Sequence, residues 1–351
     1  MIWLGLAVSL AFIPGILGAT IPTGWAVLSA FLPLALWRKG SVSLLHLALF
    51  LSWCWAVVSF AWGSSIYSSV WGLWMFTMFC LAFWLGSTIQ LRGLLIGLSV
   101  GAWVSSMVAI GQSMNLNYVL VHNFSVPSGL HFNPIAQGMF IALLIVALVG
   151  HRMWAYIPFV APGLLLSQSR GAYAACALGI LATYVRKPML LLILCLAGAV
   201  YATHRLNMND SERLAIWHGA LTYLTPLGNG IGSFMDFFIQ IGGRLRHPEY
   251  THNDFLQLAF ELGIGAIPVA LVFAGLASRT GHREWPLLIS FLFLACVAFP
   301  SYLPLTALLG AVAAGRIAGD WHSLRLPLNA GRYGLLPCLP RERQGFSETR
   351  S

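Results

Sequence analysis

The sequence predicts an all-α polytopic membrane protein, and three features indicate this fold class. Hydrophobic residues make up 58% of the 351 positions and charged residues only 8%, whereas soluble domains carry about 25% charged residues. The hydrophobic residues form long uninterrupted segments, as membrane-spanning helices require. The basic residues occur mostly in pairs at the ends of these segments, which is typical of loops that orient a protein in a bilayer.

Segments of roughly 20 apolar residues can cross a hydrocarbon core of about 30 Å, and by this measure the chain has about twelve transmembrane helices. They lie at residues 2–18, 20–37, 42–62, 66–88, 93–112, 134–150, 154–169, 171–185, 188–203, 254–277, 285–300 and 302–318. The first segment lacks the basic start of a secretory signal and runs into the second, so we interpret it as a membrane helix. The segments 154–169 and 171–185 are short, which makes them candidates for broken or re-entrant helices.

The basic pairs predict the orientation of the chain. The side that carries both termini also carries Arg38/Lys39, Arg92, His151/Arg152, Arg186/Lys187 and Arg279/Arg283. By the positive-inside rule this side is the cytoplasm. Residues 1–318 therefore form a transmembrane helical domain with one large outward loop at 204–253, and residues 319–351 form a polar cytoplasmic tail that we expect to be disordered.

The composition also excludes some classes of function. A net charge of +9 can indicate a nucleic-acid-binding protein, but orientation anchors explain these paired basic residues better than a single basic face does. Five of the six cysteines lie in apolar segments, and no CxxC or Cys/His pair has the spacing of a metal site. We therefore expect no nucleic-acid partner, no disulfide framework, no metal and no cofactor.

The loop 204–253 is the one long interval of the chain in which polar residues gather. A helix start is predicted at Asn209, and apolar residues follow at helical spacing, so we expect a short amphipathic helix whose apolar stripe faces the bundle or lipid. The stripe consists of Leu214, Trp217, Leu221 and Leu224. The run Gly228-Asn229-Gly230-Ile231-Gly232 is interpreted as a turn, with backbone approach to an anion as the alternative.

Four arginines are candidates for binding an anion. Arg170 lies between two apolar segments at the predicted outer boundary, where an ionisable residue indicates function; the alternative is a snorkelling side chain. Arg213 lies one helical turn before Trp217, which we expect to stack against it or orient it. Arg244 and Arg246 form a basic cluster that attracts anions, or else a solvated charged run.

His252 is the candidate catalytic residue, because it lies where the loop re-enters the membrane and can titrate near neutral pH. We expect Asn253 to cap the following helix. Asp254 or Glu261 is the candidate for holding the tautomer of His252. Glu261 follows Asp254 by two helical turns and so shares its face; as a buried carboxylate it needs a partner, for which Arg170 is the candidate.

Arginine side chains bind diphosphates bidentately, and a histidine can accept a proton from a hydroxyl group. At a membrane boundary, this combination predicts group transfer from a lipid-linked diphosphate. Such a leaving group is already a good anion, so arginines can stabilise its charge without a metal.

Four segments, in this order, resemble the superfamily of bacterial O-antigen ligases, O-antigen polymerases and pilin-type O-oligosaccharyltransferases. They are Ser169-Arg170-Gly171-Ala172, Arg213-Leu214-Ala215-Ile216-Trp217, Pro226 to Phe234, and Thr251 to Gln257 together with Glu261-Leu262-Gly263. The resemblance implies that His252 activates an acceptor hydroxyl and that Arg170 and Arg213 bind the diphosphate of an undecaprenyl-linked glycan. It also implies metal-independent, inverting glycosyl transfer on the periplasmic face of the bacterial inner membrane. Arg244 and Arg246 compete with Arg213 for the role of second diphosphate ligand.

Several functions fit these residues. The acceptor is a lipid A-core sugar of lipopolysaccharide for a ligase, a second lipid-linked repeat unit for a polysaccharide polymerase, or a protein hydroxyl. From a different class, a membrane transporter of an anionic or lipid-linked substrate would use the same arginines as a pathway, and flux that persists in His252→Ala would favour it. A non-catalytic scaffold would tolerate the loss of both Arg170 and His252.

Overall fold

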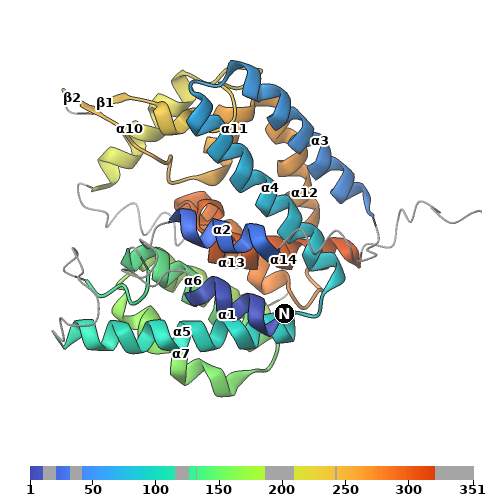
Figure 1. Ribbon diagram of the computed structural model, residues 1–351, viewed down its shortest axis with the longest axis vertical. Helices are drawn as coiled ribbons and strands as arrows, with labels where there is room; N and C mark the ends of the chain where they lie inside the picture. Colours follow the sequence, from blue (N-terminus) through green and yellow to red (C-terminus); the bar gives the residue numbers. More distant parts are fainter. Residues whose placement is uncertain are drawn as a thin grey trace, which may run out of the picture.

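A computed structural model describes residues 1–10, 21–31, 42–114, 126–131, 133–185, 209–241 and 243–320. This part of the chain is mostly helical, and its helices pack into one bundle (Figure 1). The helices of the first half are α1 (Ile2–Leu10), α2 (Ile21–Phe31), α3 (Leu44–Ser59), α4 (Ile66–Thr88), α5 (Leu91–Ser113), α6 (Pro134–Gly150), α7 (Ile157–Leu166) and α8 (Arg170–Tyr184). Those of the second half are α10 (Asn209–Thr222), α11 (Asp254–Leu262), α12 (Ile267–Ala277), α13 (Trp285–Val297) and α14 (Pro304–Gly319).

Within the described residues, four helical stretches are long and apolar enough to cross a membrane, namely Leu44–Trp62, Ile66–Thr88, Leu91–Ser113 and Asp254–Ala277. Shorter apolar helices accompany them at Pro134–Gly150, Trp154–Leu166, Trp285–Val297 and Pro304–Gly319. The chain is therefore a mostly helical protein with the character of a membrane protein. The predicted segment 188–203 and the tail from residue 321 onward lie outside the described residues.

The segment 254–277 is a helical stretch with the predicted bounds. Within it, α11 ends at Leu262, and a 3₁₀ turn that begins at Gly263, with a positive φ of 53°, leads into α12. The structure corrects the loop 204–253, in which β1 (Ile239–Ile241) and β2 (Arg244–Arg246) form an antiparallel hairpin. The expectation of an entirely α-helical chain is therefore wrong for this loop.

The large loop and the connection between α3 and α4 lie together at one end of the bundle. Ser64, between α3 and α4, donates a hydrogen bond of 2.5 Å to Asp236 in the large loop. Partial desolvation would raise the pKa of Asp236, but hydrogen bonds from Ser64 and Ser68 outweigh it and lower that pKa. These bonds fix the large loop onto the start of α4.

The connections that were predicted to face inward lie at the other end. Gly93, at the start of α5, lies beside Met1, since a Cβ atom added to this glycine would be 3.4 Å from Cβ of Met1. Gly319, at the end of α14, lies against Ser87 at the end of α4. His282, between α12 and α13, contacts Asp320. The described connections that carry the basic residues of this side thus gather at one end of the bundle.

Candidate functional site

Helix α10 covers the start of α11, and Figure 1 shows it at one edge of the bundle beside the β1–β2 hairpin. Its buried residues Ile216 and Ala220 pack against Phe234 and Phe260. Three residues of the predicted apolar stripe are exposed instead: Leu214 (61%), Leu221 (61%) and Leu224 (41%). The three leucines therefore face away from the bundle, whereas Trp217, the fourth residue of the stripe, packs against it.

The residues that precede α11 are held from two sides. Trp217 of α10 donates its indole N–H to the backbone carbonyl of Thr251 at 2.8 Å. From α11, the Gln257 side chain accepts a hydrogen bond from the N–H of Thr251 at 3.1 Å, and Thr251 is fully buried. Asn253 caps the helix as predicted, accepting from the N–H of Leu256 at 3.0 Å. The backbone on both sides of His252 is therefore fixed.

His252 adopts a left-handed backbone conformation with φ of 57°. Such a conformation is strained for a residue other than glycine, and strained residues cluster at functional sites. Its ring packs edge-on against Phe299, with ring centroids 5.2 Å apart. Burial, followed by the positive charge of Arg213, lowers the pKa of His252 from 6.5 to about 4. The imidazole is consequently neutral at pH 7 and able to accept a proton.

Arg213 links α10 to the last residue of α13. Its Nη1 donates to the carbonyl oxygen of Val297 at 3.3 Å. Since a guanidinium carries five N–H donors, this bond leaves the capacity to bind an anion bidentately. The effect of Arg213 on the pKa of His252 shows that the two side chains are electrostatically coupled.

Arg170 lies at the start of α8, which adjoins the same end of α13. It is the exposed first residue of α8, after the N-cap Ser169. A Cβ built on Gly171 would lie 4.0 Å from Cγ2 of Val297. The positive end of the α8 dipole also favours an anion at this position. Residues 297–299 are thus the common neighbours of the helix start at Arg170, the guanidinium of Arg213 and the ring of His252.

Arg244 and Arg246 do not join this cluster. Both are exposed residues of β2, and the hairpin lies beyond α10 at the edge of the molecule (Figure 1). The neighbouring His247 stacks on Phe238 with ring centroids 4.7 Å apart and contacts the Met235 carbonyl. The geometry of this hairpin matches the interpretation of its arginines as a solvated charged run.

The carboxylates of α11 have partners other than those predicted. Asp254 accepts a hydrogen bond of 2.9 Å from the backbone N–H of Ser301. Glu261, only 1% exposed, accepts from the N–H of Gly232 at 2.9 Å and from the Gln257 side chain at 3.1 Å. Backbone and amide donors occupy both oxygens of Glu261, so the predicted pair with Arg170 is wrong. Neither carboxylate bonds to His252 among the described residues, and Oδ1 of Asp254 is buried without a hydrogen-bond partner. The prediction that one of them orients His252 is therefore also wrong.

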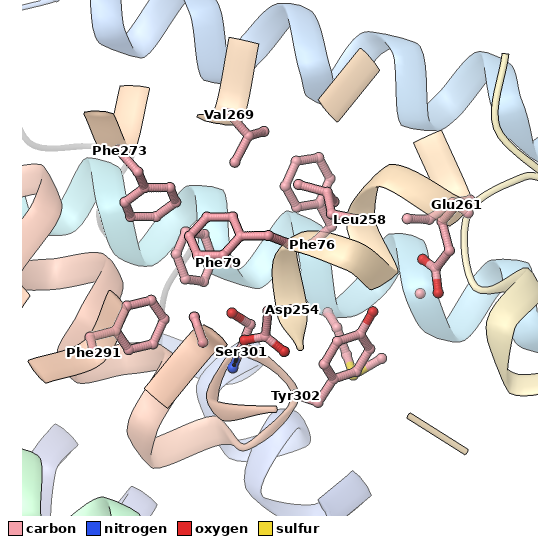
Figure 2. Close-up of a pocket in the computed structure, with 15 residues that line it drawn as sticks. Phe76, Phe79, Asp254, Leu258, Glu261, Val269, Phe273, Phe291, Ser301 and Tyr302 are labelled. Atoms are coloured by element: carbon pink, nitrogen blue, oxygen red, sulfur yellow. Dashed lines mark hydrogen bonds between the residues drawn. The ribbon is translucent and has the colours of Figure 1, made fainter. Parts of the chain in front are cut away.

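Asp254 and Glu261 do share a face of α11, since both line one cavity of about 80 Å³. Figure 2 shows phenylalanines at one end of this cavity and Asp254, Ser301 and Tyr302 at the other. The Tyr302 hydroxyl also interacts with Glu261. Ser301, Tyr302 and Gln257 were not predicted as part of this region. Only Gln257 carries a sequence signal, because it follows Asp254 by three residues and precedes Glu261 by four.

The glycine run is a turn, as predicted. Gly228, Gly230 and Gly232 all have positive φ. The N–H of Gly230 donates to the backbone carbonyl of Glu261 at 2.9 Å, and that of Gly232 donates to its carboxylate. The alternative of backbone approach to an anion is therefore wrong for Gly230, which binds a backbone carbonyl, whereas the N–H of Gly232 does bind a carboxylate, that of Glu261 in the same chain.

Within the described residues, no group of three or more His, Cys, Asp and Glu side chains is placed to hold a metal ion. No protein-family model matches the chain, and no curated protein matches it. The fold and the site together describe a mostly helical membrane protein with a neutral histidine and two arginines around the end of one helix.

Proposed function

We propose that the protein is an integral-membrane glycosyltransferase of the O-antigen ligase type, which moves a glycan from undecaprenyl diphosphate to an acceptor hydroxyl. In this proposal the chain has about twelve transmembrane helices, both termini are cytoplasmic, and the loop 204–253 and the site face the periplasm of a bacterial inner membrane. The observation that carries the proposal is that the start of α8 at Arg170, the guanidinium of Arg213 and the ring of His252 all adjoin residues 297–299.

Each of these residues has one role in the transfer. His252 accepts the proton of the acceptor hydroxyl as its oxygen attacks the anomeric carbon of the glycan. The bond between that carbon and the diphosphate oxygen breaks, and its electron pair leaves with the lipid diphosphate. Arg170 and Arg213 stabilise the charge that develops on this leaving group. A single displacement of this kind inverts the configuration at the anomeric carbon.

The coupling between Arg213 and His252 links donor binding to base strength. The positive charge of Arg213 contributes to the low pKa of His252. A diphosphate bound by Arg213 would offset this charge and raise that pKa towards neutrality, where a general base acts most effectively. The base therefore becomes stronger once the donor is in place. This coupling also favours Arg213 over Arg244 and Arg246 as the second diphosphate ligand.

The test uses the purified full-length protein, a synthetic undecaprenyl-diphosphate sugar and each acceptor class in turn: a lipid A-core, a second lipid-linked repeat unit and a protein. We expect transfer to one class only, which distinguishes ligase from polymerase. His252→Ala, Arg170→Ala and Arg213→Ala should each reduce the rate by at least 100-fold, as expected for removing a general base or a charge-stabilising group (about 10²–10⁴-fold).

The control is Arg92→Gln, which removes an exposed arginine at the start of α5, at the opposite end of the bundle. It should transfer at the wild-type rate. Full activity in both Arg170→Ala and His252→Ala, with normal membrane insertion, would refute the proposal.

A further inference from the structure

A second, polar cavity of about 430 Å³ lies at the opposite end of the bundle. It is formed where α6 and α8 end and α13 begins. Its polar lining consists of Arg152, Thr183, Thr280, His282 and Arg283. Since α13 runs from this cavity to Val297, the cavity is separated from the candidate transfer site by the length of a 13-residue helix, about 20 Å. It is therefore a separate site.

Arg152 occupies a backbone position that favours glycine. It follows the end of α6 with a positive φ of 56°. The N–H of Met153 bonds to the Leu148 carbonyl at 2.8 Å, and that of Arg152 bonds to the Val149 carbonyl at 3.0 Å. This is the Schellman pattern of helix ends, in which glycine is the usual left-handed residue. A strained arginine at this position indicates that its side chain, which lines the cavity, has a role.

Arg283 is fixed at the rim of the same cavity. Its Nε donates to the carbonyl of Gly150, the last residue of α6, at 3.0 Å. This bond orients the guanidinium and leaves its two terminal nitrogens available for an anion. Among the described residues, neither Arg152 nor Arg283 forms an ion pair with a carboxylate.

The nearby carboxylates are instead paired with histidine. Nδ1 of His282 lies 2.8 Å from Glu284, and Nε2 lies 2.9 Å from Asp320. Burial would lower the pKa of His282, but the contacts with Glu284 and Asp320 outweigh it and raise that pKa. His151 lies 3.4 Å from the other oxygen of Glu284. The acidic groups are thus engaged by the histidines, and the two arginines give the cavity its positive charge.

We propose that this cavity binds a phosphate-bearing anion through Arg152 and Arg283. Arginine pairs suit phosphate oxygens, and basic pockets between membrane helices bind the headgroups of anionic lipids. Thr280 adds a hydroxyl group to the lining. Two sources supply this chemistry: the headgroup of an anionic phospholipid and free phosphate. The proposal is independent of the glycosyl-transfer function.

The test is thermal unfolding of the purified full-length protein in neutral detergent, titrated separately with phosphatidylglycerol, phosphatidylcholine and inorganic phosphate. Native mass spectrometry counts the retained lipid. Phosphatidylglycerol should raise the unfolding temperature and phosphatidylcholine should not. A rise with inorganic phosphate alone identifies the free anion as the ligand and still supports the proposal.

Arg152→Gly is the decisive variant, because glycine fits the left-handed position and removes the charge without straining the helix end. Arg283→Gln is the second variant. Each should weaken binding about fivefold, the effect expected for one arginine near an anionic headgroup. Arg92→Gln, which removes an exposed arginine from the same end of the bundle, should bind as the wild type does.

Two results would overturn the proposal. One is the absence of any shift in the wild type with phosphatidylglycerol and with phosphate. The other is an undiminished shift in both Arg152→Gly and Arg283→Gln, which would show that these arginines serve only to interact with the carbonyl groups at the helix ends.

Discussion

The proton affinity of His252 should depend on Arg213, and the structure gives the size of the effect. Burial and the charge of Arg213 lower the pKa of His252 from 6.5 to about 4, with burial the larger cause. Since one pKa unit corresponds to about 1.4 kcal/mol, the neutral form is favoured by about 3 kcal/mol. Arg213→Gln removes the smaller contribution, so it should raise the pKa of His252 but leave it below 6.5.

The sign of the pH dependence follows from the same values. The folded protein binds a proton at His252 more weakly than the unfolded chain does. The contribution of this group to the free energy of unfolding is therefore lost as the pH falls from about 6.5 to about 4, and it is fully present above pH 6.5.

The assay is chemical modification by diethyl pyrocarbonate, which reacts with neutral imidazole. Mass spectrometry of the peptide that contains His252 separates this residue from the other nine histidines. The modification rate should be half-maximal near pH 4 in the wild type and at a higher pH in Arg213→Gln. Arg244→Gln is the matched control, since it removes the same charge from the exposed hairpin and should leave the midpoint unchanged.

Two outcomes would refute this reasoning. A wild-type midpoint near pH 6.5 would mean that His252 is not shielded from solvent as the structure shows. An equal shift in Arg213→Gln and Arg244→Gln would mean that the overall charge of the protein, and not the neighbouring guanidinium, sets the pKa.

Three further predictions concern stability, measured by thermal unfolding in detergent. Trp217→Phe removes the hydrogen-bond donor to the buried carbonyl of Thr251 and should lower the free energy of unfolding by about 1–3 kcal/mol. Gly232 and Gly243 both have φ near 75°, but only at Gly232 would a Cβ atom meet the backbone of α4. Gly232→Ala should therefore abolish folding, whereas Gly243→Ala should lower the free energy of unfolding by only about 1 kcal/mol. Asp254→Ala should lower the free energy of unfolding by about 1–3 kcal/mol more than Asp254→Asn does, because asparagine keeps an acceptor for the N–H of Ser301.

The sequence was most informative where local chemistry decides the structure. The start of α10 at Asn209 and the Asn253 cap of α11 were both predicted, because capping depends on the side chains of a few adjacent residues. The apolar segments likewise predicted most of the helices. The hairpin was missed because each strand has only three residues, too few for an alternating pattern to stand out. Gly263 gave no clear sign that it ends α11, since isolated glycines are common in membrane helices.

The partners of the site residues could not be predicted, and the reason is physical. Arg213 binds the carbonyl of Val297, and Asp254 binds the N–H of Ser301. Every residue offers such backbone groups, so residue type does not reveal which one accepts or donates. The sequence could predict that buried carboxylates on α11 need donors. It could not predict that amide donors would satisfy Glu261 and leave both arginines free for another anion. That division of partners leaves an exposed Arg170 and a half-buried Arg213 without a carboxylate partner among the described residues, and it follows only from the three-dimensional packing around α11 and α13.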